Sequence, residues 1–116
     1  IRHVGRADFR LLLDTMHLGR SGASPETVAA LDPTLIGYVQ LCDVPRQSPG
    51  MDYMTEATFE RLEPGKGDMP LREYLSAMPR DVTVSLEIPM RARAEAGVSS
   101  LDRLRPCVEA ARALMA

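Results

Sequence analysis

The stretch IGYVQLCD at residues 36–43 decides the fold class of this chain. It is rich in β-branched, aliphatic and aromatic residues, which is the composition of a strand. Two further runs have a similar character, RLLLD at residues 10–14 and VTVSLE at residues 82–87. All three runs end in a carboxylate, and each is followed by a loop and then by a helix signal. Three strand–loop–helix units in succession predict an α/β fold with a parallel sheet and crossover helices.

Helix signals lie at residues 25–31, at residues 70–78 and from residue 99 or 100 to Met115. Ser24 is the expected N-cap of the first of these helices. The second follows a long loop rich in proline and glycine, in which residues 55–61 are expected to add one helical turn. The last helix has an apolar stripe, which consists of Leu101, Leu104, Val108, Ala111 and Met115.

Side chains alternate along the run at residues 82–87, with aliphatic residues on one face and small or polar residues on the other. Such a sheet suits a helix layer on one face and a barrel interior on the other. Three strands cannot close a barrel, because a (β/α)8 barrel needs about 250 residues and this chain has 116. We therefore expect residues 1–116 to form a single partial domain. The start at Ile1 rather than at methionine suggests further sequence upstream.

The charge balance argues against several classes of partner. The 14 basic and 16 acidic side chains give a net charge of -2, which offers no footprint for nucleic acid or an anionic membrane. No apolar run reaches the roughly 20 residues of a membrane span, and no secretory signal opens the chain. Cys42 and Cys107 lie far apart without metal-ligand spacing, as expected for free thiols in the cytoplasm. We expect a cytoplasmic protein with a small-molecule substrate, and a homo-oligomer is left open.

Polar side chains stand at or near the C-terminal ends of the three predicted strands, namely Asp14, Gln40 and Glu87. Catalytic groups of α/β folds collect at this edge. Two carboxylates and an amide oxygen form a hard-oxygen set that suits Mg²⁺ or Mn²⁺. The alternative is structural, because strand-terminal carboxylates also cap the next helix or pair with an arginine. His17, in a predicted loop, is either a hydrogen-bonding or acid–base group beside the metal or a histidine bonded to a backbone carbonyl.

The segment RLEPGKGD at residues 61–68 contains a Pro-Gly-x-Gly turn, whose glycines permit positive φ and close approach to a ligand. It lacks the spacing and the Lys-Ser/Thr ending of a Walker loop. Arg46 and Arg61 are candidates to grip hydroxyl or anionic groups of a substrate, and the alternative for each is a surface arginine. Asp43 is a candidate to coordinate or orient a ligand, and the favoured alternative is a solvated strand-end carboxylate or a turn former.

In this order, the motifs resemble the C-terminal part of the xylose-isomerase-like sugar phosphate isomerase/epimerase superfamily. The resemblance rests on LLDTMH (residues 12–17), VQLCD (39–43), Arg61 with PGKG (64–67), and VSLE (84–87). It covers nearly the whole chain. It implies a (β/α)8 TIM barrel that binds one divalent cation through four side chains on separate strands. This chain would then supply about strands six to eight.

The resemblance also implies roles for single residues. Asp14, Gln40 and Glu87 would be metal ligands on strands six, seven and eight. A fourth ligand, a glutamate, would lie upstream of residue 1. His17 matches the histidine of the family's Asp-x-x-His element, which lies near metal and substrate.

Two arginines match substrate-binding positions of the same superfamily. Arg61 matches an arginine ahead of the Pro-Gly-x-Gly loop, and Arg46 follows strand seven, where related epimerases place a substrate-binding arginine. Gln40 is a departure, because many of these epimerases have histidine there. A glutamine at that position is similar to the 3-dehydroshikimate dehydratase branch.

The leading hypothesis is a divalent-metal-dependent isomerase/epimerase-like enzyme of carbohydrate metabolism that acts on a small sugar or polyhydroxy carbonyl compound. It would abstract a proton next to a carbonyl held on Mn²⁺ or Mg²⁺, with Glu87 or the upstream glutamate as base and His17 assisting at oxygen. The runner-up is a dehydratase of the 3-dehydroshikimate or inosose type, which Gln40 favours. A third hypothesis is a non-catalytic sugar-binding barrel. The isolated chain is expected to be inactive and not to fold stably alone, because its first strand would expose an unpaired edge.

Overall fold

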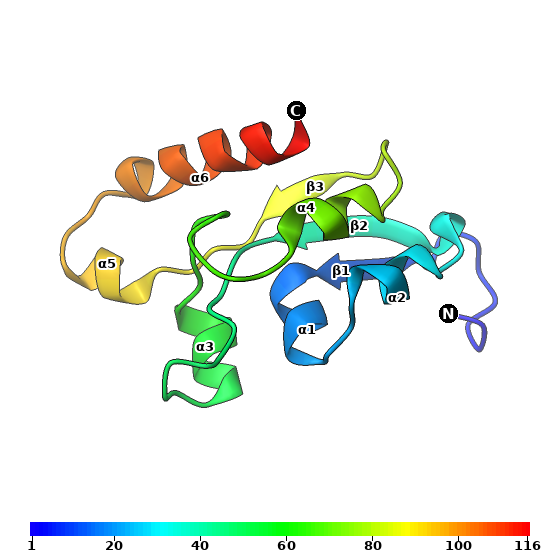
Figure 1. The fold of residues 1–116 in the computed structure, drawn as a ribbon, viewed down its shortest axis with the longest axis horizontal. Coiled ribbons are helices and arrows are strands. Elements are labelled where there is room, and N and C mark those ends of the chain that lie inside the picture. The colour runs from blue at the N-terminus through cyan, green and yellow to red at the C-terminus, as the bar shows by residue number, and fades with distance from the viewer.

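The computed structural model describes residues Ile1–Ala116 and contains one parallel sheet of three strands (Figure 1). The strands are β1 (Leu11–Asp14), β2 (Ile36–Leu41) and β3 (Val84–Leu86), and they lie side by side in sequence order. β2 pairs in parallel with both neighbours, so the sheet is open and β1 and β3 are its edges. The α/β class and the parallel sheet that the sequence predicts are confirmed.

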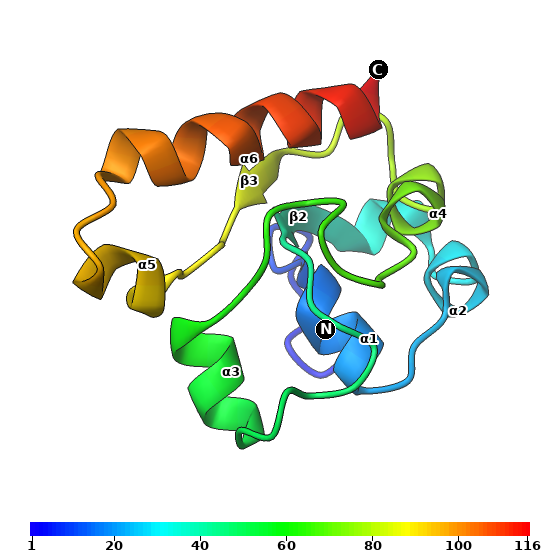
Figure 2. The same ribbon diagram turned by 60° about the vertical axis from the view of Figure 1, so that its left-hand side comes forward.

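Helical segments follow each strand. In chain order they are α1 (Thr15–Arg20), α2 (Pro25–Ala29), the 3₁₀ turn η1 (Pro33–Leu35), α3 (Tyr53–Phe59), α4 (Leu71–Ser76), α5 (Arg91–Glu95) and α6 (Ser100–Met115). α2 contacts α4 and α4 contacts α6, so these three helices form one layer beside the sheet (Figure 2). α1, α3 and α5 lie instead at the end of the sheet where the strands finish (Figure 1).

The hydrophobic core lies between the sheet and this helix layer. Leu13 of β1 and Val39 of β2 pack with Val28 of α2 and Tyr74 of α4. A second cluster lies beneath α6 and consists of Leu41, Leu71 and Ala111. Burial of these side chains is what fixes α2, α4 and α6 on one face of the sheet.

The opposite face of the sheet has no helix layer. Leu12 of β1 is 53% exposed and Tyr38 of β2 is 36% exposed, and both side chains belong to this face. The alternation in the sequence therefore has the predicted outcome. One face carries helices, and the other is open in the manner of a barrel interior.

α1 and α5 differ from the sequence prediction, which has loops at both places. α1 starts directly after β1, because Oδ1 of Asp14 accepts a hydrogen bond from the backbone N–H of His17 at 3.1 Å. This cap satisfies one of the amides left open at a helix start. His17 therefore lies in the first turn of a helix, and the loop predicted for it is wrong.

The other elements lie where the sequence predicts them, with different bounds. Ser24 caps α2 as expected, by accepting a hydrogen bond from the Thr27 N–H. The predicted helix ends at residues 31 and 78 are each two residues too late, since α2 ends at Ala29 and α4 ends at Ser76. α3 starts at Tyr53, where Asp52 caps it, and forms a full short helix rather than a single turn.

The buried face of α6 is not the predicted stripe. Leu101 is 60% exposed and Leu104 is 50% exposed, and of the stripe only Ala111 is buried. The helix instead buries Cys107 together with Ala111, which lies one turn further on the same face. The periodicity predicts that α6 has an apolar face but does not tell which of two neighbouring apolar faces meets this sheet. Neither α6 nor any shorter helix has the length and apolar character that a membrane crossing requires.

Candidate active site

The three predicted metal ligands lie at the same edge of the sheet. Asp14 of β1 pairs in register with Gln40 of β2, and Gln40 pairs with Ser85 of β3. Glu87 follows directly after β3, where its N–H donates to the carbonyl oxygen of Leu41 at 3.2 Å. Asp14 is buried, whereas Gln40 and Glu87 are half-buried. The structure therefore places one oxygen donor at the end of each strand.

Arg61 lies between the two carboxylates. Its Nη1 is 2.6 Å from Oδ2 of Asp14 and 3.6 Å from Oε2 of Glu87. Its Nε donates to the carbonyl oxygen of Ala57 at 3.0 Å, so the last turn of α3 holds the guanidinium in place. The side chains of Arg61 and Asp14 are each 2% exposed. Asp14 therefore does both of the structural things that the sequence left open, because it caps α1 and pairs with an arginine. Arg61 is not a surface arginine.

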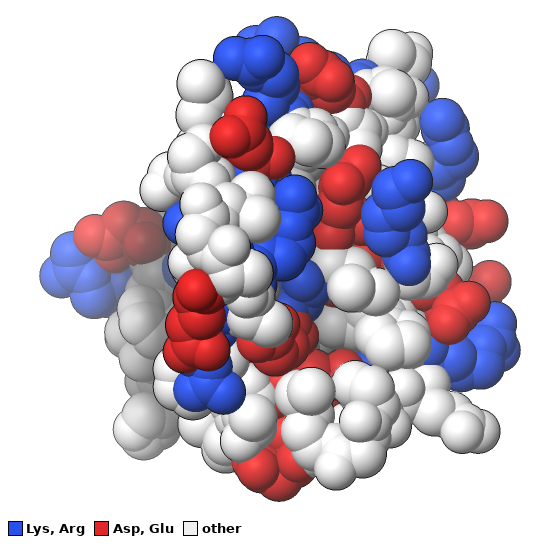
Figure 3. Space-filling view, turned by 90° about the vertical axis from the view of Figure 1, so that its left-hand side faces the viewer, with Lys and Arg blue, Asp and Glu red and all other residues white.

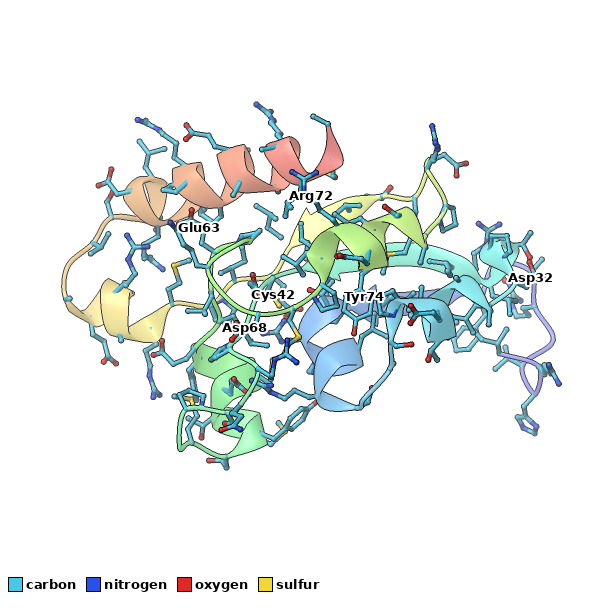
Figure 4. All side chains as sticks on the ribbon, viewed as in Figure 1. Asp32, Cys42, Glu63, Asp68, Arg72 and Tyr74 are labelled. Carbon is cyan, nitrogen blue, oxygen red and sulfur yellow. The ribbon has the colours of Figure 1, made fainter.

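Cys42, which is labelled near the middle of Figure 4, is fully buried and contacts this ion pair. Its Sγ lies 3.5 Å from Nη1 of Arg61, and its backbone is fixed by Thr15, whose hydroxyl donates to the Cys42 carbonyl oxygen at 2.7 Å. Burial raises the pKa of the Cys42 thiol, and the negative charge of Asp14 raises it further. Cys42 is therefore a buried side chain that packs against the Arg61–Asp14 pair.

His17 is exposed at the start of α1 and contacts α3. The hydroxyl of Tyr53 lies 2.5 Å from Nδ1 of His17, and the two ring centroids are 5.6 Å apart. Nδ1 is thus engaged, and Nε2 is the ring nitrogen that remains for other partners. The alternative in which the His17 ring is bonded to a backbone carbonyl is not what the structure shows.

A cleft of about 730 Å³ opens beside these groups. Its lining includes His17, Arg61 and Glu87 on the polar side and Tyr53 and Met54 of α3 on another. Figure 3 shows the end of the molecule that carries α3 and α5, where acidic and basic side chains are intermixed without a patch of single sign. A cleft of this size, with a few polar groups among apolar ones, has the character of a small-molecule site.

Of the three predicted substrate-binding residues, Arg46 is the one that does not line the cleft. Its side chain is exposed and is not among the groups that line the cleft. Only its backbone is fixed: its N–H donates to Asp68 at 2.9 Å, and its carbonyl oxygen accepts from Arg20 at 3.0 Å. In this structure Arg46 and the cleft residues are therefore not brought together.

The Pro-Gly-x-Gly loop folds around Asp43. Oδ2 of Asp43 accepts hydrogen bonds from the N–H groups of Gly65 at 2.9 Å and Gly67 at 3.0 Å. Oδ1 accepts from Val44 at 2.9 Å and Met69 at 3.1 Å. A Cβ at residue 67 would overlap the Asp43 carboxylate, which explains the glycine there. Asp43 is only 1% exposed, so the expectation of a solvated carboxylate is wrong. The amides of Gly65 and Gly67 are committed to Asp43.

The donors at the strand ends have the chemistry that a hard divalent cation requires. Asp14 and Glu87 supply carboxylate oxygens, and Gln40 supplies an amide oxygen. No three His, Cys, Asp or Glu side chains lie close enough together to hold an ion by themselves. Both Asp14 oxygens already accept hydrogen bonds, from His17 and Arg61. Each of these oxygens has a second lone pair, so the two hydrogen bonds leave Asp14 with acceptor capacity for a cation.

Two side-chain contacts between α1 and α3, which hold the helices beside the cleft, are not predicted from the sequence. Tyr53 bonds to His17, and Glu56 bonds to Arg20, both between α1 and α3. The available signal is a matched spacing, because His17 and Arg20 are three residues apart and so are Tyr53 and Glu56. Without a predicted helix at residues 15–20, this spacing has no meaning in the sequence.

The fold and the site define an open α/β sheet with functional groups at the carboxyl ends of its strands, as in part of a TIM barrel. Comparison of the chain with known protein families and with curated proteins gives no match. Solved structures do match. The IolI protein, crystallised with a bound zinc atom, matches with a TM-score of 0.80 and 20% identity over 99% of this chain and 40% of that one.

Two further matches carry the name of the fold. A fusion of a xylose isomerase-like TIM barrel with a 4-hydroxyphenylpyruvate dioxygenase matches with a TM-score of 0.64 and 25% identity, over 94% of this chain and 20% of that one. A xylose isomerase domain protein from Alicyclobacillus acidocaldarius matches with a TM-score of 0.64 and 24% identity, over 98% of this chain and 40% of that one. The chain thus has the fold of part of a xylose isomerase-like TIM barrel, and it spans 40% or less of the length of these proteins.

Proposed function

We propose that this chain is the C-terminal part, about strands six to eight, of a metal-dependent isomerase/epimerase-like barrel enzyme that acts on a small sugar or polyhydroxy carbonyl compound. The observation that carries the proposal is the convergence of Asp14, Gln40 and Glu87 at three adjacent strand ends, beside the cleft lined by His17 and Arg61. Function in this fold resides in such strand-end groups rather than in the fold itself.

Asp14, Gln40 and Glu87 would hold one divalent cation, together with a glutamate from an earlier strand. When bound, such a cation would polarise a carbonyl of the substrate. The oxygen donors support Mg²⁺ or Mn²⁺. The zinc atom in the IolI structure supports a divalent ion of some kind in a barrel of this fold.

Glu87 is the residue of this chain best placed to abstract a proton from a carbon atom of the substrate. Its side chain is 44% exposed and lines the cleft, so substrate can reach it, whereas Asp14 is buried beneath. Oε2 of Glu87 lies 3.6 Å from Nη1 of Arg61, so the carboxylate is held at the cleft wall. His17 would address a substrate oxygen through Nε2, and Arg61 would contact a hydroxyl or anionic group of the substrate from the cleft wall.

The test replaces Glu87 by glutamine in the full-length protein, with Glu95→Gln as the matched control. Glu95 lies on α5 with a side chain that is 73% exposed, and it does not line the cleft. Proton abstraction is measured as deuterium uptake from solvent into a panel of ketoses and cyclic polyol ketones, followed by proton NMR. We expect Glu87→Gln to lower exchange by about a factor of 100 or more, the usual contribution of a general base. Unchanged exchange in Glu87→Gln would refute the assignment.

A dehydratase of the 3-dehydroshikimate or inosose type is the second candidate. The observation that favours it is Gln40, an amide donor in direct register with Asp14 where many epimerases have histidine. The same proton abstraction would then be followed by loss of hydroxide. Incubation of the full-length protein with 3-dehydroshikimate and Mn²⁺ distinguishes the two, because only the dehydratase yields an aromatic product with ultraviolet absorbance. Absence of both deuterium uptake and product would favour a non-catalytic sugar-binding barrel.

A further inference from the structure

Helices α1 and α3 are joined by two side-chain pairs of identical sequence separation. His17 bonds to Tyr53, and Arg20 bonds to Glu56, so each pair spans 36 residues. Residues three apart lie on the same face of a helix, one turn from each other. The two pairs are therefore successive connections between the same two helix faces.

The Arg20–Glu56 pair is the inner connection and fixes α3 in place. Nη2 of Arg20 lies 2.6 Å from Oε1 of Glu56, and Nε lies 2.9 Å from Oε2, which is a bidentate geometry. Glu56 is only 1% exposed, and Arg20 is its partner in this buried position. Arg20 also donates to the carbonyl oxygens of Pro45 and Arg46, which ties the loop after β2 to the same point.

The His17–Tyr53 pair is the outer connection and lies in the cleft. Tyr53 is 47% exposed, and both rings belong to the cleft lining. The tyrosine hydroxyl is 2.5 Å from Nδ1, and the ring planes meet at 45°. Neither side chain is needed to fill the core, so packing does not account for their contact.

We propose that Tyr53 is a positioning residue that holds Nδ1 of His17 and thereby presents Nε2 to the substrate. In a neutral imidazole one nitrogen donates and the other accepts. Whichever atom of the pair donates, Nδ1 is engaged by Tyr53 and Nε2 is the ring nitrogen left for the substrate. The inference rests on the proposed function in one respect, namely that His17 acts on a substrate oxygen.

The geometry assigns the two connections different tasks. The buried ionic pair fixes where α3 lies relative to α1, and the exposed His17–Tyr53 pair uses that position to orient one ring. Because the second depends on the first, Tyr53 can set the orientation of His17 without any anchor of its own in the core. Histidines whose second nitrogen is held in this way keep one tautomer and one ring orientation.

The test is Tyr53→Phe in the full-length protein, with the histidine side chains labelled with ¹⁵N. We expect the Nδ1 resonance of His17 to move on loss of the hydroxyl, while that of the exposed His3 stays constant. We also expect kcat to fall about tenfold with little change in KM, a smaller loss than that of the acid–base group itself. An unmoved Nδ1 resonance would overturn the proposal, and so would a moved resonance with unchanged kcat.

Tyr74→Phe is the matched control, because the Tyr74 hydroxyl also makes a short hydrogen bond, at 2.5 Å to the carbonyl oxygen of Ala23, but lies in the core. It should lower stability and leave both the His17 resonance and kcat unchanged. His17→Gln separates this inference from the proposed function. If that variant retains full kcat, the proposed role of His17 fails, whereas the resonance shift in Tyr53→Phe still reports on the hydrogen bond.

Discussion

Asp14 and Asp43 are both buried aspartates at the ends of neighbouring strands, and they differ in the groups that contact their carboxylates. Asp43 accepts four hydrogen bonds, all from backbone N–H groups. Asp14 accepts one hydrogen bond from the backbone N–H of His17 and forms an ion pair with the side chain of Arg61. Backbone amides cannot leave without refolding the loop, whereas a side chain can exchange partners. The comparison marks Asp43 as structural and Asp14 as the carboxylate that can take part in binding.

Among the substitutions considered, Asp43→Asn is expected to lower the free energy of unfolding most. The substitution would remove the carboxylate that accepts from four backbone N–H groups. It would also place the NH₂ of asparagine, a donor, opposite some of these backbone donors. We expect a loss of about 4 kcal/mol in the free energy of unfolding, since hydrogen bonds to a buried charge are among the costliest to remove. Urea denaturation of the full-length protein measures it.

The control for that variant is Asp68→Asn, because Asp68 is exposed and accepts only from the Arg46 N–H. It should cost well under 1 kcal/mol, as surface changes usually do. If Asp43→Asn were as mild as Asp68→Asn, the loop would not depend on the carboxylate and Asp43 would have to be reconsidered as a ligand.

A smaller effect is expected for Arg61→Met, which keeps the apolar stem and removes the cation beside Asp14. A buried carboxylate left without its partner typically costs about 3 kcal/mol in unfolding free energy. The double variant Asp14→Asn/Arg61→Met should recover a good part of this loss, because it removes the uncompensated charge. Arg46→Met, an exposed arginine, serves as the control. Strict additivity of Asp14→Asn and Arg61→Met would show that the ion pair contributes nothing.

The sequence predicts the parallel sheet and the strand-end donors, because both depend on local patterns. Alternation along residues 82–87 indicates the two faces of the sheet, and parallel strands bring Asp14 and Gln40 to one edge without further information. The contacts of Asp43 and of His17 could not be predicted in this way. They depend on how the long segment between β2 and β3 folds back, and nothing in the local composition shows that its amides converge on one carboxylate.

The same limit explains the role of Arg61. The sequence shows an arginine ahead of a glycine-rich turn, and the resemblance suggests a residue that binds substrate. Its burial against Asp14 arises from the β-bridge that joins Asp43 and Leu62 and from the turn of α3 that precedes it. A sequence pattern cannot tell a side chain that reaches inward from one that faces solvent when both lie in a loop.

The divalent metal content of the purified full-length protein, compared with that of its Asp14→Asn and Glu95→Gln variants, decides whether the strand-end carboxylates bind a metal ion. We predict about one Mn²⁺ or Mg²⁺ ion per chain after dialysis against limiting metal in the parent protein and in Glu95→Gln, and a near-complete loss in Asp14→Asn with the fold retained. A full complement of metal in Asp14→Asn would contradict the claim that the strand-end carboxylates form the metal site.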